Sequence, residues 1–202
     1  MKLRKKAKMK QYNLIALFGK SGSGKTTVLN WLIRNFPEKL HKVIACTTRP
    51  RREGEEDGRE YHFISVDEFT QKTLSGEMIE ATSFRDWFYG TEISALREDK
   101  LNVAIFSPEA LNCVLEDPRI NTYPVYVYAS DKKRLMRSLD REYAPDCYEI
   151  CRRFLADEKD FAHIDEIEHQ WWFNEYNSDL DDDEMTLFKA ERLFEFIAAG
   201  QN

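Results

Sequence analysis

The residue pattern with the clearest chemical meaning lies near the N-terminus, where residues 19–26 read Gly-Lys-Ser-Gly-Ser-Gly-Lys-Thr and fit G-x-x-x-x-G-K-[ST]. Residues 13–18, just before it, form an apolar stretch typical of a strand, and residues 27–33, just after it, carry apolar side chains on roughly one helical face. A strand, a glycine-rich loop and a helix N-terminus in this order direct consecutive backbone N–H groups at an anion. The pattern predicts a site for a nucleoside triphosphate, and its flanks argue against a chance glycine-rich turn.

The residues of this loop have expected roles. Lys25 would reach the β- and γ-phosphates, and the Thr26 hydroxyl would hold Mg²⁺. The residues that we expect to contact the triphosphate are Ser21, Gly22, Ser23, Gly24, Lys25, Thr26 and Thr27.

A second candidate anion site lies in residues 47–63, which read Thr-Thr-Arg-Pro-Arg-Arg-Glu-Gly-Glu-Glu-Asp-Gly-Arg-Glu-Tyr-His-Phe. The planar guanidinium groups of Arg49 and Arg52 match the oxygens of a phosphomonoester, and Tyr61 adds another donor. The acidic residues of the same segment allow a different interpretation, a solvated loop in which they pair with the arginines.

The order of these segments makes the chain, from about residue 12 to residue 175, resemble the guanylate kinase family. Residues 47–63 follow that family's TTRxxRxGExxGxxYxF pattern, and Ile79-Glu80 with Phe88-Tyr89-Gly90-Thr91 resemble its IE…YG[ST] segment. The resemblance implies an ATP-dependent nucleoside-monophosphate kinase that acts on GMP or dGMP. It also implies that the acceptor's phosphate is bound by Arg49, Arg52, Tyr61 and Tyr89, and that its base is read by Glu80 and Thr91.

Residues 137–153, which carry several arginines around Pro145, resemble the family's lid less closely. The lid arginines close over the triphosphate, and Arg141 with Arg152 has the family's spacing. Arg137 and Arg153 are alternatives.

The resemblance also places Asn174 in the loop that contacts adenine. The catalytic residues that it implies are Lys25, Arg49, Arg141 and Arg152. They are cations directed at the charge that develops on the transferred group.

The chain departs from the family at two places. Phe106 and Pro108 stand where a D-x-D pair is usual, and Glu109 is the nearest acid in the sequence that could substitute. A non-acidic strand end resembles the ribosyl-bisphosphate kinases, although those lack the pattern of residues 47–63. Ala45 replaces a serine that helps to read guanine, at a cost of about 0.5–1.5 kcal/mol if no other donor takes its place.

Strands alternate with helices along the chain. We expect further strands at residues 42–46, 102–106, 123–128 and 169–173, with Pro108 in a first helical turn, Asp131 as a helix cap and a last helix over residues 184–198. This alternation predicts an α/β chain with a parallel sheet covered on both faces. With the resemblance, we expect a three-layer P-loop NTPase fold of about five strands. Residues 12–202 would form one domain, with a core of 12–46 and 94–202, an acceptor-binding insert at about 47–93 and a helical lid at about 137–153.

The composition and net charge of the chain limit its expected partners and its expected location in the cell. The 202 residues include 42% hydrophobic residues and carry a net charge of −6, and no apolar run is long enough to cross a membrane. We expect no membrane partner and no general affinity for nucleic acid. Residues 1–11 predict a basic, disordered tail, although a nucleic-acid arm stays open. We interpret the four cysteines as reduced thiols, mostly packed in the core, of a cytoplasmic protein.

Other functions stay open at this stage. The acceptor could be another nucleoside monophosphate or a ribosyl phosphate. The chain could also be a non-catalytic binding module, like the guanylate-kinase-like domains of scaffold proteins, or a kinase tethered to nucleic acid. The intact Gly24-Lys25-Thr26 favours a kinase over a scaffold module. A homodimer is left open.

Overall fold

The computed structural model describes residues 12–141, 143–173 and 183–199. The predicted basic tail and Asn174 lie outside these described residues. The elements, in chain order, are β1 (Tyr12–Phe18), α1 (Lys25–Asn35), β2 (Leu40–Lys42), β3 (Cys46–Thr47), β4 (His62–Phe63), α2 (Val66–Leu74), β5 (Met78–Phe84), β6 (Trp87–Glu92), η1 (Ile93–Ala95), β7 (Leu101–Ile105), α3 (Pro108–Glu116), β8 (Ile120–Tyr128), α4 (Asp131–Asp140), α5 (Cys147–Asp160), η2 (Ile164–Glu166), β9 (Gln170–Phe173) and α6 (Asp183–Ala199).

The centre of the molecule is a five-stranded parallel sheet in the order β2-β7-β1-β8-β9. Strand β1 lies in the middle, and its residues Leu14 to Phe18 are fully buried. This burial explains the apolar run before the glycine-rich loop, because a central parallel strand is covered on both faces. The predicted parallel sheet of about five strands is confirmed.

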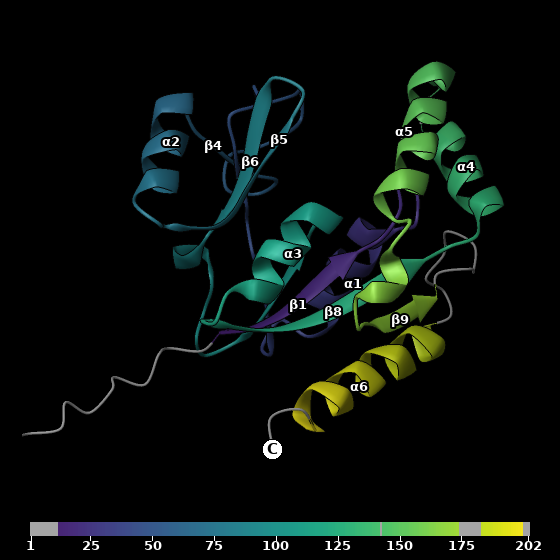
Figure 1. The fold of residues 1–202 in the computed structure, drawn as a ribbon. Helices are drawn as coiled ribbons and strands as arrows, with labels where there is room; N and C mark the ends of the chain where they lie inside the picture. The colour runs from purple at the N-terminus through teal and green to yellow at the C-terminus, as the bar shows by residue number, and fades with distance from the viewer. Residues whose placement is uncertain (1–11, 142, 174–182, 200–202) are drawn as a thin grey trace, which may run out of the picture.

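Two helical layers cover this sheet. On one face, α1 and α6 pack with Ile15, Leu17 and Val125. On the other face, α3 packs with Leu14, Ala16 and Phe18 of β1. Figure 1 shows α3 above the sheet and α6 below it. Alternate residues of β1 therefore point into two separate cores, which is the predicted three-layer arrangement.

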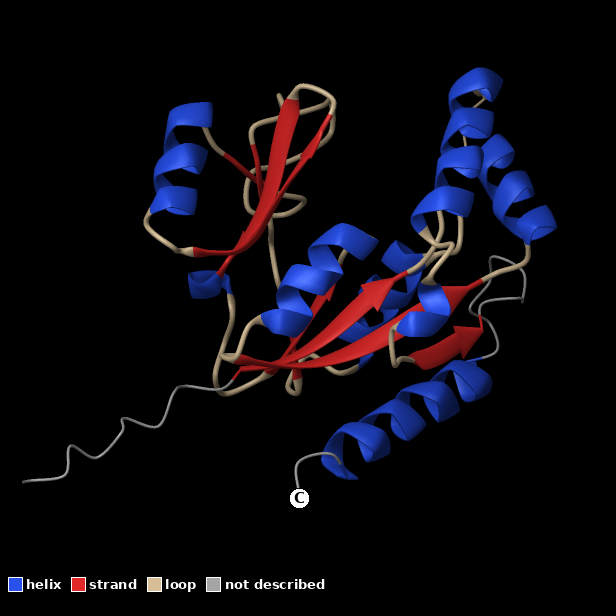
Figure 2. Ribbon diagram, viewed as in Figure 1, coloured by secondary structure: helices blue, strands red, loops and turns tan. Residues whose placement is uncertain are grey.

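A second sheet belongs to the insert, in the order β4-β3-β6-β5, with α2 beside it (Figure 2). The prediction of one strand over residues 42–46 is wrong, because this segment divides between the two sheets. β2 ends at Lys42 in the main sheet, and β3 begins at Cys46, which pairs with Gly90 of β6. As an edge strand, β2 has a neighbour on one side only, so the chain can leave the main sheet early and start the insert.

The helix caps agree only in part with the prediction. Ser107 caps α3 by accepting a hydrogen bond from the Ala110 N–H, and Pro108 occupies the first turn as expected. At α4 the N-cap residue is Ser130, so the prediction of Asp131 as the cap is wrong. Asp131 is the first helical residue, and its carboxylate accepts a hydrogen bond from the Arg134 side chain instead.

All four cysteines are free thiols, as expected, but only Cys46 is buried. Cys113, Cys147 and Cys151 are exposed, so the expectation that most cysteines pack in the core is wrong. They lie on helices α3 and α5, whose buried faces are made by other residues. None of the helices in the described part of the chain combines the length and hydrophobicity that a membrane crossing requires.

Candidate active site

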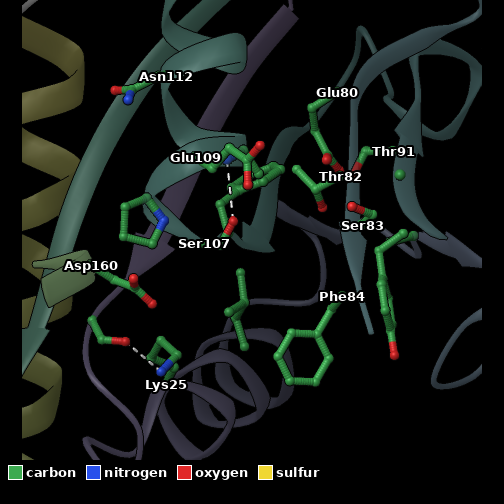
Figure 3. A pocket seen from close by; sticks show the side chains of 18 of the residues that line it. Lys25, Glu80, Thr82, Ser83, Phe84, Thr91, Ser107, Glu109, Asn112 and Asp160 are labelled. Atoms are coloured by element: carbon green, nitrogen blue, oxygen red, sulfur yellow. Dashed lines mark hydrogen bonds between the residues drawn. The ribbon is translucent and has the colours of Figure 1, made fainter. Parts of the chain in front are cut away.

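A cavity of about 790 Å³ lies where the carboxyl ends of the central strands, the insert and α5 meet. Its walls come from all three parts: the glycine-rich loop supplies Gly19 and Lys25, the insert supplies Glu80 and Thr91, and α5 supplies Asp157 and Asp160. Figure 3 shows Glu80 beside Thr91 on one side of this cavity and Lys25 on the other. In open α/β sheets this edge is the usual place for ligands.

The phosphate loop, residues 19–26, connects β1 to α1. Gly19 has φ 151°, and a Cβ there would lie 2.4 Å from the Val127 carbonyl oxygen, so no other residue fits without rearrangement. Gly24 is the N-cap of α1, and no described side chain caps this helix. The N–H groups of its first turn, which begins Lys25-Thr26-Thr27, are therefore open to an anion.

Lys25 lies inside this loop. Its Nζ donates hydrogen bonds to the carbonyl oxygens of Gly19, at 2.7 Å, and Lys20, at 3.1 Å. Burial lowers its pKa to about 8, and the nearby Asp157 carboxylate opposes that shift. The ammonium group is thus held at the mouth of the loop, where a phosphate would replace the water it has lost.

Among the acids of the insert, Glu80 stands out for its burial and its hydrogen bonding. It is only 7% exposed. Its Oε1 accepts a hydrogen bond from the Thr91 hydroxyl at 2.7 Å, whereas its Oε2 is buried and has no hydrogen-bond partner among the described residues. Burial raises the pKa of this carboxyl to about 7. A buried carboxylate oxygen without a donor is costly, so Glu80 is arranged to receive a donor from a ligand.

The other predicted acceptor residues divide into two groups. Tyr61 and Tyr89 line the cavity together, with ring centroids 5.9 Å apart. Arg49 lies behind them, 4% exposed, and its guanidinium forms a two-pronged pair with Glu55 at 2.8 and 3.0 Å. Arg52 is exposed. Neither arginine lines the cavity. The sequence allowed the arginines of this segment to pair with its acids, and Arg49 does so with Glu55.

Comparison with known proteins decides the family. The model of the guanylate kinase family matches residues 11–189, which is most of the chain. The chain belongs to the guanylate kinase family. The predicted resemblance is confirmed, and it extends over the phosphate loop, the insert and the lid.

Individual relatives match over shorter lengths. The guanylate kinase of Schizosaccharomyces pombe is 38% identical over 84 residues, 42% of each protein, and that of Helicobacter pylori is 39% identical over 94 residues, 45% of each. The chain thus spans less than half the length of these two relatives. The guanylate kinase of Campylobacter jejuni is 26% identical over 160 residues, 77% of this chain and 78% of the relative.

A solved structure supports the fold. The crystal structure of guanylate kinase from Anaplasma phagocytophilum superposes with a TM-score of 0.60 at 22% identity, covering 90% of this chain and 87% of that one. The architecture described above is therefore the architecture of a guanylate kinase.

The residues of this guanylate kinase family member predicted to form a lid, about 137–153, lie on α4 and α5, which stand above the sheet opposite the insert (Figure 1). Arg141, at the end of α4, is exposed. Arg152 donates to Glu149 at 2.7 and 2.9 Å, and Arg153 donates to the same carboxylate at 2.8 Å. Arg137 contacts the phosphate loop, with Nη1 3.4 Å from the Ser23 carbonyl oxygen.

The strand end that lacks the family's acids has a structural explanation. Phe106 is buried in the core cluster beneath α3, and Pro108 opens that helix, so both side chains serve packing and helix initiation. Glu109 is exposed on the first turn of α3 and lines the cavity. Figure 3 shows it facing Glu80, and its charge helps to raise the pKa of Glu80.

Sequence reasoning missed two residues of this region, Arg134 and Asp157. Both are buried, and together they contact the phosphate loop at Ser21. Neither belongs to a recognisable motif, and they lie 23 positions apart on different helices. The only signal in the sequence was one charged residue within the amphipathic pattern of each helix, Arg134 in α4 and Asp157 in α5.

Proposed function

We propose that this chain transfers the γ-phosphoryl group of ATP to a guanine nucleoside monophosphate, GMP or dGMP. The observation that carries the proposal is the buried, unpartnered Oε2 of Glu80, which lies in the same cavity as Lys25 of the phosphate loop. Guanine presents two adjacent donors, N1–H and the N2 amine, that a carboxylate can accept together. Adenine has no such pair of donors.

Phosphoryl transfer requires correct positioning of the reactants and positive charge more than it requires acid–base groups. Phosphoryl transfer spreads negative charge over the oxygens of the moving group, so cations and correct alignment lower its barrier. Lys25 would supply one cation, and Arg137, Arg141 or Arg152 would supply others from the lid. The insert and the lid flank the cavity from both sides, and their closure would exclude water, which would otherwise compete with the acceptor.

The residues fit a magnesium ion that arrives with ATP. Thr26 is exposed at the start of α1, next to Lys25. Among the described residues, no group of three His, Cys, Asp or Glu side chains could hold a metal ion by itself. Mg²⁺ often keeps several waters and takes substrate phosphates as ligands, so Thr26 would complete its shell. When bound, the ion would neutralise charge on the β- and γ-phosphates.

Two features of the cavity bear on the choice of base. Ala45 lines it without a hydroxyl, but Thr82 and Ser83 line it as well and offer hydroxyl donors near Glu80 (Figure 3). Glu109 adds a second carboxylate on the opposite side. We propose that Glu80 accepts both N1–H and the N2 amine and that Glu109 adds a second acceptor for the N2 amine. A cytoplasmic location is also proposed, in keeping with four free thiols.

The deciding experiment is a coupled assay with ATP·Mg²⁺ and each common ribo- and deoxyribonucleoside monophosphate, together with IMP, which keeps N1–H but lacks the N2 amine. We expect turnover with GMP and dGMP and lower kcat/KM with IMP. Glu80→Gln should lower kcat/KM for both GMP and IMP, whereas Glu109→Gln should lower it for GMP only. Turnover on another acceptor with none on GMP or dGMP would reject the guanine assignment. Failure to bind ATP·Mg²⁺ in calorimetry would instead favour a binding module.

A further inference from the structure

Arg134 of α4 is the largest fully buried charged side chain among the described residues, with 1% exposure. Its guanidinium is shared among three elements. Nη1 donates to Asp131 at 2.7 Å, Nη2 donates to Asp157 of α5 at 2.7 Å, and Nε donates to the Ser21 carbonyl oxygen at 2.9 Å. Its flat face lies 4.5 Å from the ring centroid of Phe154. Each donating nitrogen of the planar fork therefore has an acceptor.

Asp157 completes the arrangement from the last turn of α5. Besides Arg134, its carboxylate accepts the backbone N–H of Ser21 at 2.7 Å and the Ser21 hydroxyl at 3.2 Å. The N–H and the carbonyl of Ser21 are thus both held by lid residues. With its two polar ends bound, the backbone at Ser21 has little freedom to rotate, and it begins the turn that presents the remaining N–H groups of the phosphate loop.

Close packing supports these hydrogen bonds. Gly22 has φ 75°, and a Cβ at this position would lie 2.6 Å from the Arg134 carbonyl oxygen. Helix α4 therefore rests directly on the loop. A second ion pair, Lys20 with Glu158 at 2.6 Å, joins the loop to the same turn of α5.

Desolvating two charges is expensive, and an apolar pair of similar volume would often be at least as stable. Stability therefore does not explain why Arg134 and Asp157 occupy this position. What the pair does is join three segments that are distant in sequence: the phosphate loop, the first turn of α4 and the last turn of α5. The remainder of the lid, with Arg141 and Arg152, extends away from this junction.

We propose that Arg134 and Asp157 are positioning residues that hold the phosphate loop in its triphosphate-binding shape and form the fixed base on which the outer lid closes. The inference rests on the proposed function in one respect, that the ligand of the loop is the triphosphate of ATP. Asp157 has a further effect, since its charge keeps the pKa of Lys25 from falling further in its buried site.

The test compares Arg134→Met, Arg134→Lys and Asp157→Asn with a matched pair of controls, Arg119→Met and Asp117→Asn. Arg119 and Asp117 also form an ion pair, at 2.6 Å, but at the opposite edge of the sheet, where β8 begins. We expect the three test variants to raise KM for ATP or lower kcat by about 10- to 100-fold, since small displacements of phosphate-binding groups are costly. KM for the acceptor should change by less than about threefold, because the acceptor meets the insert. Arg134→Lys should not rescue, since an ammonium cannot replace a three-way fork.

Hydrogen exchange separates this role from a purely structural one and needs no turnover. In the ATP-free wild type, the Ser21 amide should be protected because Asp157 accepts its hydrogen bond, and Asp157→Asn should speed its exchange. Rapid exchange in the wild type would overturn the proposal, even if the variants failed to fold. So would test variants whose melting temperatures fall while KM for ATP and kcat stay within about twofold of the Arg119→Met control. A wild type that lacks kinase activity would instead reject the proposed function and leave the exchange result interpretable.

Discussion

At the scale of single residues, the site is defined by two buried titratable groups whose surroundings work against their charges. Glu80 and Lys25 face one cavity, and burial raises the pKa of the acid to about 7 and lowers that of the base to about 8. Each would regain favourable interactions from a nucleotide, one from donors on a base and the other from phosphate oxygens. The free energy needed to bury the charges of these two groups is the physical indication that the cavity binds a ligand.

Lys25→Ala should lower kcat by about 10²–10³-fold, since it removes a cation that acts on the developing charge in a dry site. Steady-state kinetics with saturating ATP and GMP would measure the loss. Asn30→Ala, at an exposed position of α1 outside the phosphate-loop pattern, provides the comparison and should cost less. Equal losses in the two variants would argue against a special role for the Lys25 ammonium.

Glu80 should also make stability depend on pH. Its folded-state pKa is raised from 4.5 to about 7, so the folded protein holds this proton more tightly than the unfolded chain. The stabilisation is fully present below pH 4.5 and is lost as the pH rises through about 7, by up to about 3 kcal/mol. Glu80→Gln is neutral throughout, so its stability relative to wild type should increase between pH 5 and pH 8. Urea unfolding at both pH values measures this change, and parallel curves for the two proteins would contradict it.

At the scale of elements, the insert holds Arg49, the arginine predicted to bind the acceptor's phosphate, in a fixed position. Arg49 is buried, bound at both prongs by Glu55, and its guanidinium carbon lies 5.7 Å from the centroid of the Tyr61 ring. Glu55 also accepts the backbone N–H of Arg52 and so shapes the turn between the two arginines. Glu55 is therefore an internal partner of the predicted phosphate site.

Glu55→Gln should raise KM for the acceptor severalfold and leave KM for ATP nearly unchanged, because it leaves a buried guanidinium short of acceptors. Glu56→Gln is the matched control, since Glu56 is mostly exposed and pairs with Arg59 on the surface. The two Michaelis constants, measured separately for each variant, check the prediction. A rise in both constants for Glu55→Gln would point to general disruption of the protein.

At the scale of the whole molecule, the parallel sheet forms the centre, and two smaller parts rise from its carboxyl edge. The insert lines one side of the cavity with Glu80 and Thr91, and α4 and α5 stand opposite the insert (Figure 1). One ion pair already joins the two smaller parts, Arg85 at the β5–β6 turn with Glu149 of α5, at 3.0 Å. The insert and α5 are therefore in direct contact.

The pH dependence of the reaction should reveal both sides of the cavity. With saturating ATP, kcat/KM for GMP should rise as the pH increases through about 7, because only ionised Glu80 accepts two donors. With saturating GMP, kcat/KM for ATP should fall as the pH increases through about 8, when free Lys25 loses its proton. The acidic limb should disappear in Glu80→Gln. A wild-type profile that is flat from pH 6 to pH 9 would remove both groups from the mechanism.

Local patterns in the sequence predicted much of this molecule. The phosphate loop, the acceptor segment of residues 47–63 and the alternation of strands and helices are short-range features, because a helix start or a buried strand depends mainly on neighbouring residues. The family and the fold class that they indicated are both confirmed. The roles of the individual site residues, Asn174 included, stay predictions.

The tertiary structure decided what depends on contacts between distant segments. The division of residues 42–46 between two sheets, the exposure of Cys113, Cys147 and Cys151, and the pairing of Arg134 with Asp157 have no local signature. The same holds for the unpartnered oxygen of Glu80, since its surroundings come from β6 and α3 as well as β5. Sequence patterns establish which residues prefer a helix, a strand or an anion. Only the packed chain determines which charges are buried, and burial is what makes those charges chemically useful.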